Sequence, residues 1–233
     1  NRKIGKCPLK VKIDVKNDVR KVYGLNSMLE RLSKENTTLK LQFYWSFFGG
    51  LRDFYDSEDY LSILLDKDSK CKLSVYRGTL STRLLQMLPE SLTQLYIRVY
   101  PDQLEYLNAQ LAKLPDLWSL TVYLFLTEKD DQYHSKTIKT DPSSLPLLKY
   151  KGKQLGIKVR APITVDDIPW IVAVIKRLTQ EHQCDTLEIY GTRLDYVKHV
   201  SDLIVALHEA DIHVTTWLKL QNRMDWNNEY QEK

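Results

Sequence analysis

The stretch CDTLEIYGTRL, residues 184 to 194, indicates a β-strand that runs into a turn. Its apolar residues Cys184, Leu187, Ile189 and Leu194 fall at the intervals expected of a unit that is repeated along a chain. A single match of this kind has little weight, because any strand followed by a turn can fit the spacing by chance. The fold therefore depends on whether the pattern recurs.

Pairs of apolar residues separated by one position, as in a β-strand, recur from one end of the chain to the other. Their first members lie about 29 residues apart on average, a period typical of proteins built from repeated structural units. The intervals between pairs are uneven, so the expected repeat is irregular. The pairs are Val11/Ile13, Leu39/Leu41, Leu73/Val75, Leu95/Ile97, Leu120/Val122, Leu155/Ile157, Leu187/Ile189 and Ile212/Val214.

Segments with helical periodicity lie between these pairs. Residues 104–114 carry leucines at intervals of three and four, and Pro101 precedes them in a place suited to the first turn of a helix. Thr164 and Asp167 form a predicted capping box at the start of another periodic segment. Residues 194–207 repeat the apolar pattern once more. We therefore expect a helix after each strand.

The predicted strands alternate apolar and polar residues, as in the segments Leu95–Val99 and Leu155–Val159. The strands of a doubly wound α/β sheet are covered on both faces and read as nearly continuous Val, Ile and Leu. The alternation therefore favours a sheet with helices on one face and solvent on the other, in which each unit stacks only on its neighbours. A doubly wound or barrel domain is the structural alternative.

The chain resembles the ribonuclease-inhibitor-like class of leucine-rich repeat proteins, in which each unit pairs a parallel strand with a helix. The resemblance implies an α/β fold, namely a solenoid of about eight strand–helix units with a curved parallel sheet. Thr192, Gly78 and Tyr100 stand at the turn position that holds Asn in the family, which implies less regular turns. We expect residues 1–233 to form one such domain, either complete or as part of a larger protein.

Cytosolic innate-immune receptors and F-box substrate adaptors carry arrays of this class, so the resemblance also implies protein recognition. The polar strand residues would line the concave face, because side chains alternate along a strand. Tyrosine and arginine are enriched at protein interfaces, although tyrosine also suits any half-exposed strand. The candidate partner-binding residues are Tyr76, Tyr96, Arg98, Tyr123, Lys158 and Tyr190.

Residues 127–154 lack helical periodicity and fill the longest interval between two predicted strands. Long segments without regular structure are usually either functional loops or disordered. The sequence leaves both interpretations open. We predict an irregular inserted loop over this range.

Signals of chemistry are sparse. The chain has no phosphate-binding, dinucleotide-binding, nucleophile-elbow or zinc-protease motif. Cys7, Cys71 and Cys184 have neither the spacing of a zinc site nor the density of a disulfide framework. We therefore predict a protein without catalytic residues, metal or cofactor, in the reducing environment of the cytoplasm.

Composition limits the choice of partner. The chain is 43% hydrophobic with a net charge of +4, and charged residues interrupt every apolar run before it is long enough to span a membrane. Mild positive charge falls short of the footprint of a nucleic-acid-binding protein. A protein is therefore the expected partner. The alternatives left open are a compact α/β enzyme or small-ligand-binding domain, and a binder of RNA or another polyanion.

Overall fold

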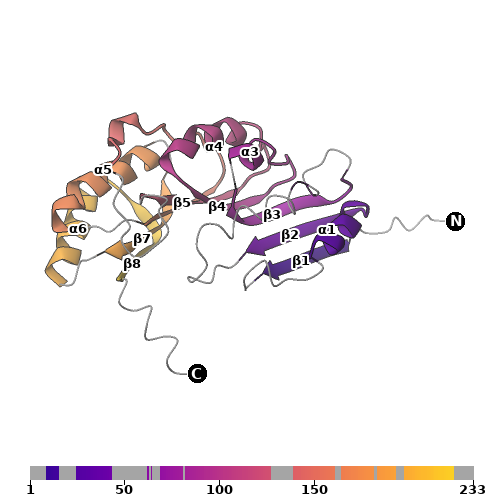
Figure 1. Cartoon of the computed structure of the whole chain (residues 1–233). Helices are drawn as coiled ribbons and strands as arrows, with labels where there is room; N and C mark the ends of the chain where they lie inside the picture. Colours follow the sequence, from indigo (N-terminus) through magenta and orange to yellow (C-terminus); the bar gives the residue numbers. More distant parts are fainter. Residues whose placement is uncertain are drawn as a thin grey trace, which may run out of the picture.

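Eight β-strands form one all-parallel sheet in the computed structural model (Figure 1). The structure describes residues 9–15, 25–43, 62, 64, 69–80, 82–126, 139–160, 164–180, 183–192 and 197–222 of the 233-residue chain. The strands lie side by side in chain order: β1 (Leu9–Val15), β2 (Thr37–Phe43), β3 (Lys72–Thr79), β4 (Gln94–Val99), β5 (Ser119–Phe125), β6 (Gln154–Arg160), β7 (Cys184–Thr192) and β8 (Val214–Asn222). The predicted α/β class with a parallel sheet is confirmed.

The order of the strands never reverses, and β1 and β8 lie at the two edges of the sheet. Doubly wound α/β domains bind their ligands at the point where the strand order reverses. The eight described strands contain no such point. They also do not close into a barrel, so neither structural alternative matches the observed topology.

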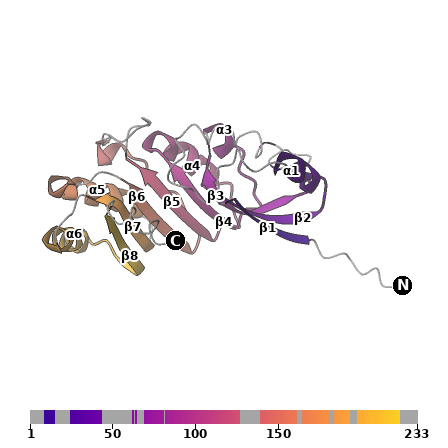
Figure 2. The same cartoon turned by 60° about the horizontal axis from the view of Figure 1, so that its bottom comes forward.

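The helices lie on one side of the sheet. Figures 1 and 2 show α3, α4, α5 and α6 along the same face, and buried Leu29 of α1 belongs to the same hydrophobic core. In the described part of the chain, no helix lies on the opposite face (Figure 2). The bounds are α1 (Leu25–Ser33), α3 (Thr82–Leu85), α4 (Leu104–Leu111), α5 (Ile168–Thr179) and α6 (Val197–Glu209), with 3₁₀ turns η3 (Pro101–Gln103), η4 (Pro142–Ser144) and η5 (Val165–Asp167).

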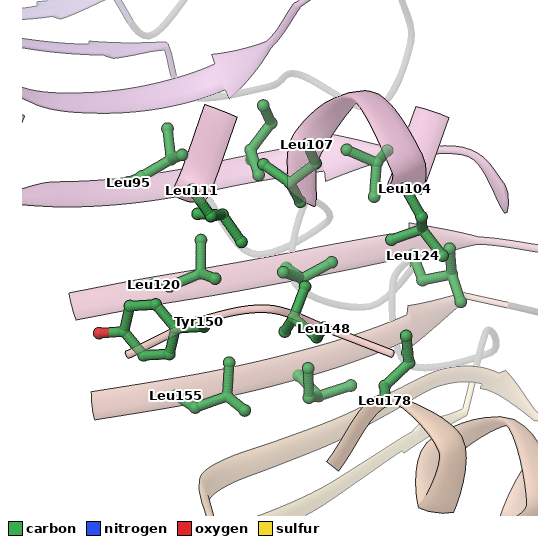
Figure 3. Packing of buried hydrophobic residues seen from close by; sticks show 14 of the residues in the cluster. Leu95, Leu104, Leu107, Leu111, Leu120, Leu124, Leu148, Tyr150, Leu155 and Leu178 are labelled. Atoms are coloured by element: carbon green, nitrogen blue, oxygen red, sulfur yellow. The ribbon is translucent and has the colours of Figure 1, made fainter. Parts of the chain in front are cut away.

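The core consists of rows of apolar side chains that run across the strands on the helix side. Leu95 of β4 pairs with Leu120 of β5, which pairs with Leu155 of β6, and all three are buried. Figure 3 shows the α4 residue Leu111 near Leu95 and Leu120, and Leu155 on the next strand near Tyr150. Burying a leucine side chain contributes about 1.5–3 kcal/mol, so these rows hold the helices on the sheet.

The register of β3 differs from the prediction. A β-bulge between β2 and β3 leaves Ser74 without a partner on β2, and Tyr76 rather than Val75 lies opposite Leu95. The Ser74 hydroxyl donates a hydrogen bond to the Leu39 carbonyl at 3.1 Å. One extra residue turns all the following side chains to the other face of a sheet. The predicted core pair Leu73/Val75 is therefore replaced by Leu73 and Tyr76.

The last predicted pair, Ile212/Val214, is also out of register. In the backbone register, Leu218 and Leu220 of β8 rather than Ile212 and Val214 lie opposite Leu187 and Ile189 of β7. Ile212 instead lies in the turn between α6 and β8, where it is buried.

Two predicted helix starts are confirmed. Pro101 opens η3, which leads directly into α4. At the start of α5, the Asp167 carboxylate accepts hydrogen bonds from the Thr164 backbone amide at 2.9 Å and its hydroxyl at 2.7 Å. These bonds satisfy donors that a helix N-terminus leaves without partners.

The described part of the connection between β5 and β6, residues 126 and 139–153, contains the 3₁₀ turn η4 but no α-helix. Residues 127–138 of the predicted insert lie outside the described part, whereas residues 139–153 are described and include three buried side chains. Leu145, Leu148 and Tyr150 are buried in the main core, and Figure 3 shows Leu148 and Tyr150 beside the leucines of the sheet. In residues 139–153, packing of these three side chains rather than a helix fixes the segment on the core.

Two helices hold this segment in place. The Asn108 side chain on α4 donates to the Leu147 carbonyl at 2.7 Å and accepts from the Lys149 amide at 2.8 Å. On α5, the Arg177 guanidinium donates to the Leu145 carbonyl at 2.8 Å. Side chains from α4 and α5 thus satisfy three backbone groups of this irregular segment.

Candidate functional site

The sheet face opposite the helices carries aromatic and cationic side chains, and we call it the aromatic face. Its members follow from the register of the strands, because residues paired across neighbouring strands share a face. Arg77 pairs with Tyr96, Arg98 with Tyr123, Tyr123 with Lys158, and Phe125 with Arg160. The described side chains that we use to define this face are Arg77, Tyr96, Arg98, Tyr100, Tyr123, Phe125, Lys158, Arg160 and Glu188.

The centre of the aromatic face is a second, small hydrophobic cluster. Tyr100, Tyr123 and Phe125 are buried, and the half-buried Tyr96 packs against them. The ring centroids of Tyr123 and Phe125 lie 4.7 Å apart, and those of Tyr100 and Phe125 lie 5.8 Å apart. Tilted pairs at these separations are favourable beyond the area that they bury.

Arg98 lies on this cluster. Its guanidinium carbon is 4.2 Å from the centroid of the Phe125 ring and 5.3 Å from that of Tyr123, within the range of cation–π attraction. Only 8% of Arg98 is exposed. Burial lowers the pKa of Arg98 to about 10, and the positive charge of Arg160 acts in the same direction. The face therefore holds a buried positive charge against aromatic rings.

The ring of Tyr96 on β4 contacts one cation from each side of its strand. The Arg77 guanidinium from β3 lies 4.4 Å from its ring centroid, and the Lys158 ammonium from β6 lies 5.3 Å away. Lys158 also forms a 2.7 Å ion pair with Glu188 of β7. These contacts make a continuous chain of side chains from β3 to β7.

The local environment keeps the tyrosine hydroxyls protonated. Burial raises the pKa of Tyr96 to about 12, although the charges of Arg77 and Arg98 act in the opposite direction. Burial also raises the pKa of Tyr123. Neither phenol is thus prepared to act as a base near neutral pH.

Small residues lie beside Tyr96 on the same face. Thr121 and Gly156 pair with each other, and Gly156 pairs with Thr186. A Cβ atom added at Gly156 would lie 2.6 Å from the Thr186 hydroxyl and 3.0 Å from that of Thr121. The glycine therefore lets the side chains of two neighbouring strands approach each other closely.

The structure brings four of the six predicted residues together. Tyr96, Arg98, Tyr123 and Lys158 are joined by ring, cation–π and backbone pairings. Tyr190 lies at the matching strand position opposite Arg160, but its side chain is outside the described part of the structure.

The predicted place of Tyr76 on this face is wrong. Tyr76 is 1% exposed and belongs to the helix-side core, because the bulge at Ser74 turns it to the other side of β3. Burial alone raises its pKa. The prediction that the face meets solvent also fails at its centre, where Arg98 and Tyr123 are 8% and 6% exposed.

The sequence reasoning missed several residues of the face. Phe125 and Arg160 continue the strand alternation two residues beyond Tyr123 and Lys158, so a longer count along the strands would have found them. Arg77 lies on this face only because of the bulge, which the alternation does not reveal.

Metal-binding groups, cysteine thiols and apolar helices can also be examined in the described residues. Within them, no group of three or more His, Cys, Asp or Glu side chains is arranged to hold a metal ion. Cys71 and Cys184 are buried free thiols, and burial raises the pKa of both. None of the described helices is long and apolar enough to cross a membrane.

Comparison with protein-family models, curated proteins and solved structures found no match to this chain.

Proposed function

We propose that this chain is a non-enzymatic protein-recognition module, built as a leucine-rich repeat solenoid of about eight strand–helix units, which binds a protein partner through the aromatic face. The sequential order of parallel strands, with helices on one side, supports the repeat architecture. By resemblance, the module would be the sensing part of an immune receptor or the substrate-recruiting part of a ubiquitin-ligase adaptor, in the cytoplasm.

One observation carries the proposal: Tyr96 is half-buried and contacts both Arg77 and Lys158. Residues that contribute most to protein binding are typically tyrosine, tryptophan or arginine side chains held in place by their neighbours. A side chain fixed before binding loses less conformational entropy when the complex forms. Tyr96 has these properties and stands on a central strand of the sheet.

The cluster beneath Tyr96 supports the same function. The rings of Tyr123 and Phe125, two residues apart on the same face of β5, pack against each other and form a rigid base. The partly exposed charges of Arg77, Lys158 and Arg160 surround this base. An apolar centre with a polar rim is the usual composition of a protein-binding patch.

The proposal is tested by affinity capture from a cell lysate with the tagged chain and two variants. Tyr96→Ala combined with Arg77→Gln removes the stacked pair, while Tyr106→Ala removes a tyrosine that is 43% exposed on α4. We expect one or more proteins to be captured by the wild type and by Tyr106→Ala, but lost from the double variant. Circular dichroism establishes that all three proteins are folded. Equal capture by all three would refute binding through the aromatic face.

A further inference from the structure

We propose that the end of the sheet formed by α6 and β8 binds a second copy of this chain, related to the first by a two-fold axis. We call this surface, made of the outer side of α6 and the outer edge of β8, the β8 end. The inference goes beyond the proposed function, because it concerns a surface other than the aromatic face. It follows from the sides of the helices that face neighbouring units, from the residues on the last of these sides, and from the open edge of β8.

On α4, Asn108 marks the side of the helix that faces the following unit. This residue comes directly after Leu107, which is buried in the main core. The Asn108 side chain forms hydrogen bonds with the backbone of Leu147 and Lys149, which lie between β5 and β6. The residue directly after a core residue therefore faces the next unit along the chain.

On α5, two residues mark the side that faces the preceding unit. Trp170 and Arg177 come directly before core residues of the helix. The Trp170 ring nitrogen donates a hydrogen bond to the Thr140 carbonyl at 2.8 Å, and Arg177 donates to the Leu145 carbonyl. Thr140 and Leu145 precede β6 in the chain. The residue directly before a core residue therefore faces the previous unit.

This rule places Ile204 on the outer side of the last described helix. On α5, Val172 follows the core residue Ile171 and faces α6, which packs against α5, so that only 7% of Val172 is exposed. Ile204 follows the core residue Leu203 in the same way, but it is 45% exposed. Figure 2 shows α6 at the end of the row of helices, and no described helix lies beyond it. Ile204 thus lies where a further unit would make contact.

The outer side of α6 carries no Asp, Glu, Lys or Arg at its exposed described positions. These are Ser201, Ile204 and His208, which share one side of the helix because they lie three and four residues apart. In proteins built of stacked units, the terminal units need a polar outer face to remain soluble. On α1, at the other end of the sheet, exposed Arg31 directly precedes the core-packed Leu32 and so faces outward. The β8 end is therefore the one suited to being covered.

The edge of β8 lies at the same end. β8 is the last strand of the sheet, so no described strand pairs with its outer edge. An open strand edge can pair with another chain. A two-fold axis perpendicular to the sheet would pair the β8 strands of two copies in antiparallel orientation. The same axis would place the two α6 helices side by side on one face.

The residues of α6 fit a second copy. Two such helices overlap most fully when the axis passes near their midpoint, which lies between Ser201 and Ile204. Ile204 of each copy then lies opposite the small Ser201 of the other. Large side chains opposite small ones allow two helices to pack closely. The outer side of α6 is therefore complementary to itself.

The size of the β8 end also suits a dimer. The nine residues of β8 span about 30 Å, and a helix packed on a sheet is about 20 Å high, so the end covers roughly 600 Å² in outline. A standard interface buries about 800 Å² of accessible surface per partner, which is of the same order. Stacking the β8 end on the β1 edge instead would cover Arg31 and would not close, whereas a two-fold axis closes with two copies.

A dimer of this form has a consequence for recognition. The eight strands of each copy would join in one continuous sheet, with both aromatic faces on the same side. A partner that carries two binding segments would then be bound at two places, which raises the overall affinity without any new contact.

Sedimentation equilibrium of the full chain tests the proposal over a range of about 1 to 100 µM. We expect the mass to rise with concentration from that of one chain to that of two. A chain that stays monomeric at every concentration would overturn the proposal, and a different occupant would then cover this end. Growth beyond two copies would also overturn it, because a two-fold interface closes.

Two variants locate the interface. Ile204→Glu places a charge at the centre of the contact and should weaken dimerisation about tenfold or more. Tyr106→Glu makes a similar change at an exposed aromatic residue of α4 and should alter dimerisation less than about twofold. Circular dichroism establishes that both variants are folded. Equal effects of the two substitutions would overturn the placement of the interface.

A residue exchange tests the contact between Ile204 and Ser201. Ser201→Ile alone should weaken dimerisation about tenfold, because two isoleucines would then lie opposite each other. Ser201→Ile combined with Ile204→Ser keeps one large and one small residue at each contact and should restore dimerisation to within about threefold of wild type. Nonspecific association of apolar surfaces would instead be strengthened by Ser201→Ile alone, and that result would overturn the proposal.

Discussion

Tyr76 lies opposite Leu95 in the sheet, and its side chain is therefore on the helix side, whereas Tyr96, one residue farther along β4, is on the aromatic face. The two tyrosines, both predicted to lie on the same face, are therefore on opposite faces of the sheet. Tyr76 fills the core as the largest of the fully buried side chains among the described residues. Tyr96 contacts the cations of the opposite face.

Replacing these tyrosines should separate stability from binding. Tyr76→Ala should lower the free energy of unfolding by about 3–5 kcal/mol, because it leaves a cavity in the core. Tyr96→Ala should cost only about 1–2 kcal/mol, because its side chain is half-buried. Urea unfolding followed by circular dichroism measures both values. A larger loss for Tyr96→Ala would contradict the observed register.

The cluster on the aromatic face should stabilise the fold as well as shape it. Phe125→Ala removes the ring that contacts Tyr100, Tyr123 and Arg98, and we expect a loss of about 3–4 kcal/mol. Phe125→Leu keeps most of the apolar volume and should cost about half as much. Thermal unfolding of the two variants checks this order. Equal melting temperatures for wild type and Phe125→Ala would show that the cluster contributes nothing to the stability of the fold.

The capping box of α5 should make stability depend on pH. Burial alone would raise the pKa of Asp167, but its 2.6 Å ion pair with Lys139 and its hydrogen bonds from Thr164 outweigh burial, so the pKa is lowered. A carboxyl with a lowered pKa in the folded state stabilises the protein above its unfolded pKa, near 3.9, and loses that contribution as pH falls through the folded value.

Asp167→Asn should therefore reduce the free energy of unfolding by about 1–2 kcal/mol at pH 7. The difference from wild type should shrink below about pH 4, where the carboxylate becomes protonated. Asp166→Asn is the matched control, because the carboxylate of Asp166 neighbours Asp167 but is exposed. A loss that is the same at every pH would mean that the charge of Asp167 is not what stabilises the helix start.

Gly152 should tolerate no side chain. A Cβ atom at this position would collide with the Leu117 carbonyl oxygen and the Tyr150 hydroxyl, and the first of these is fixed backbone. Gly152→Ala should cost about 2–3 kcal/mol. Gly156→Ala should cost less, about 1 kcal/mol, because the threonine hydroxyls that it would meet can rotate away. Chemical denaturation of the two variants compares these costs, and the reverse order would contradict this packing.

The parallel sheet and its order were predictable where the alternation is clean. In β4, β5 and β6, Leu95, Leu120 and Leu155 each begin an apolar–polar alternation, and they do lie opposite one another. The start of α5 was predictable because Thr164 and Asp167 are a local signal that needs no tertiary contact.

The remaining features depend on interactions between distant parts of the chain. Val75 and Tyr76 are both apolar and adjacent, so the pattern does not show which faces the core until the bulge at Ser74 fixes the register. In β8 the sequence contains two apolar pairs, and only the backbone pairing with β7 shows that Leu218 and Leu220 lie opposite Leu187 and Ile189.

The aromatic face was predictable only in part for the same reason. Tyr96, Arg98, Tyr123 and Lys158 could be assigned to one face by counting along the strands. Their burial could not be predicted in this way. Arg98 contacts the rings of Tyr123 and Phe125 on β5, and counting along the strands does not reveal these contacts.

Site-specific photocrosslinking tests binding through the aromatic face most directly. Benzoylphenylalanine would replace Thr121, which lies beside Tyr96 on this face, or Tyr106, which is exposed on α4. After incubation with lysate and irradiation, we predict a covalent adduct with a partner protein from position 121 and none from position 106. An adduct from position 106 alone would contradict the account and place the interface on the helices.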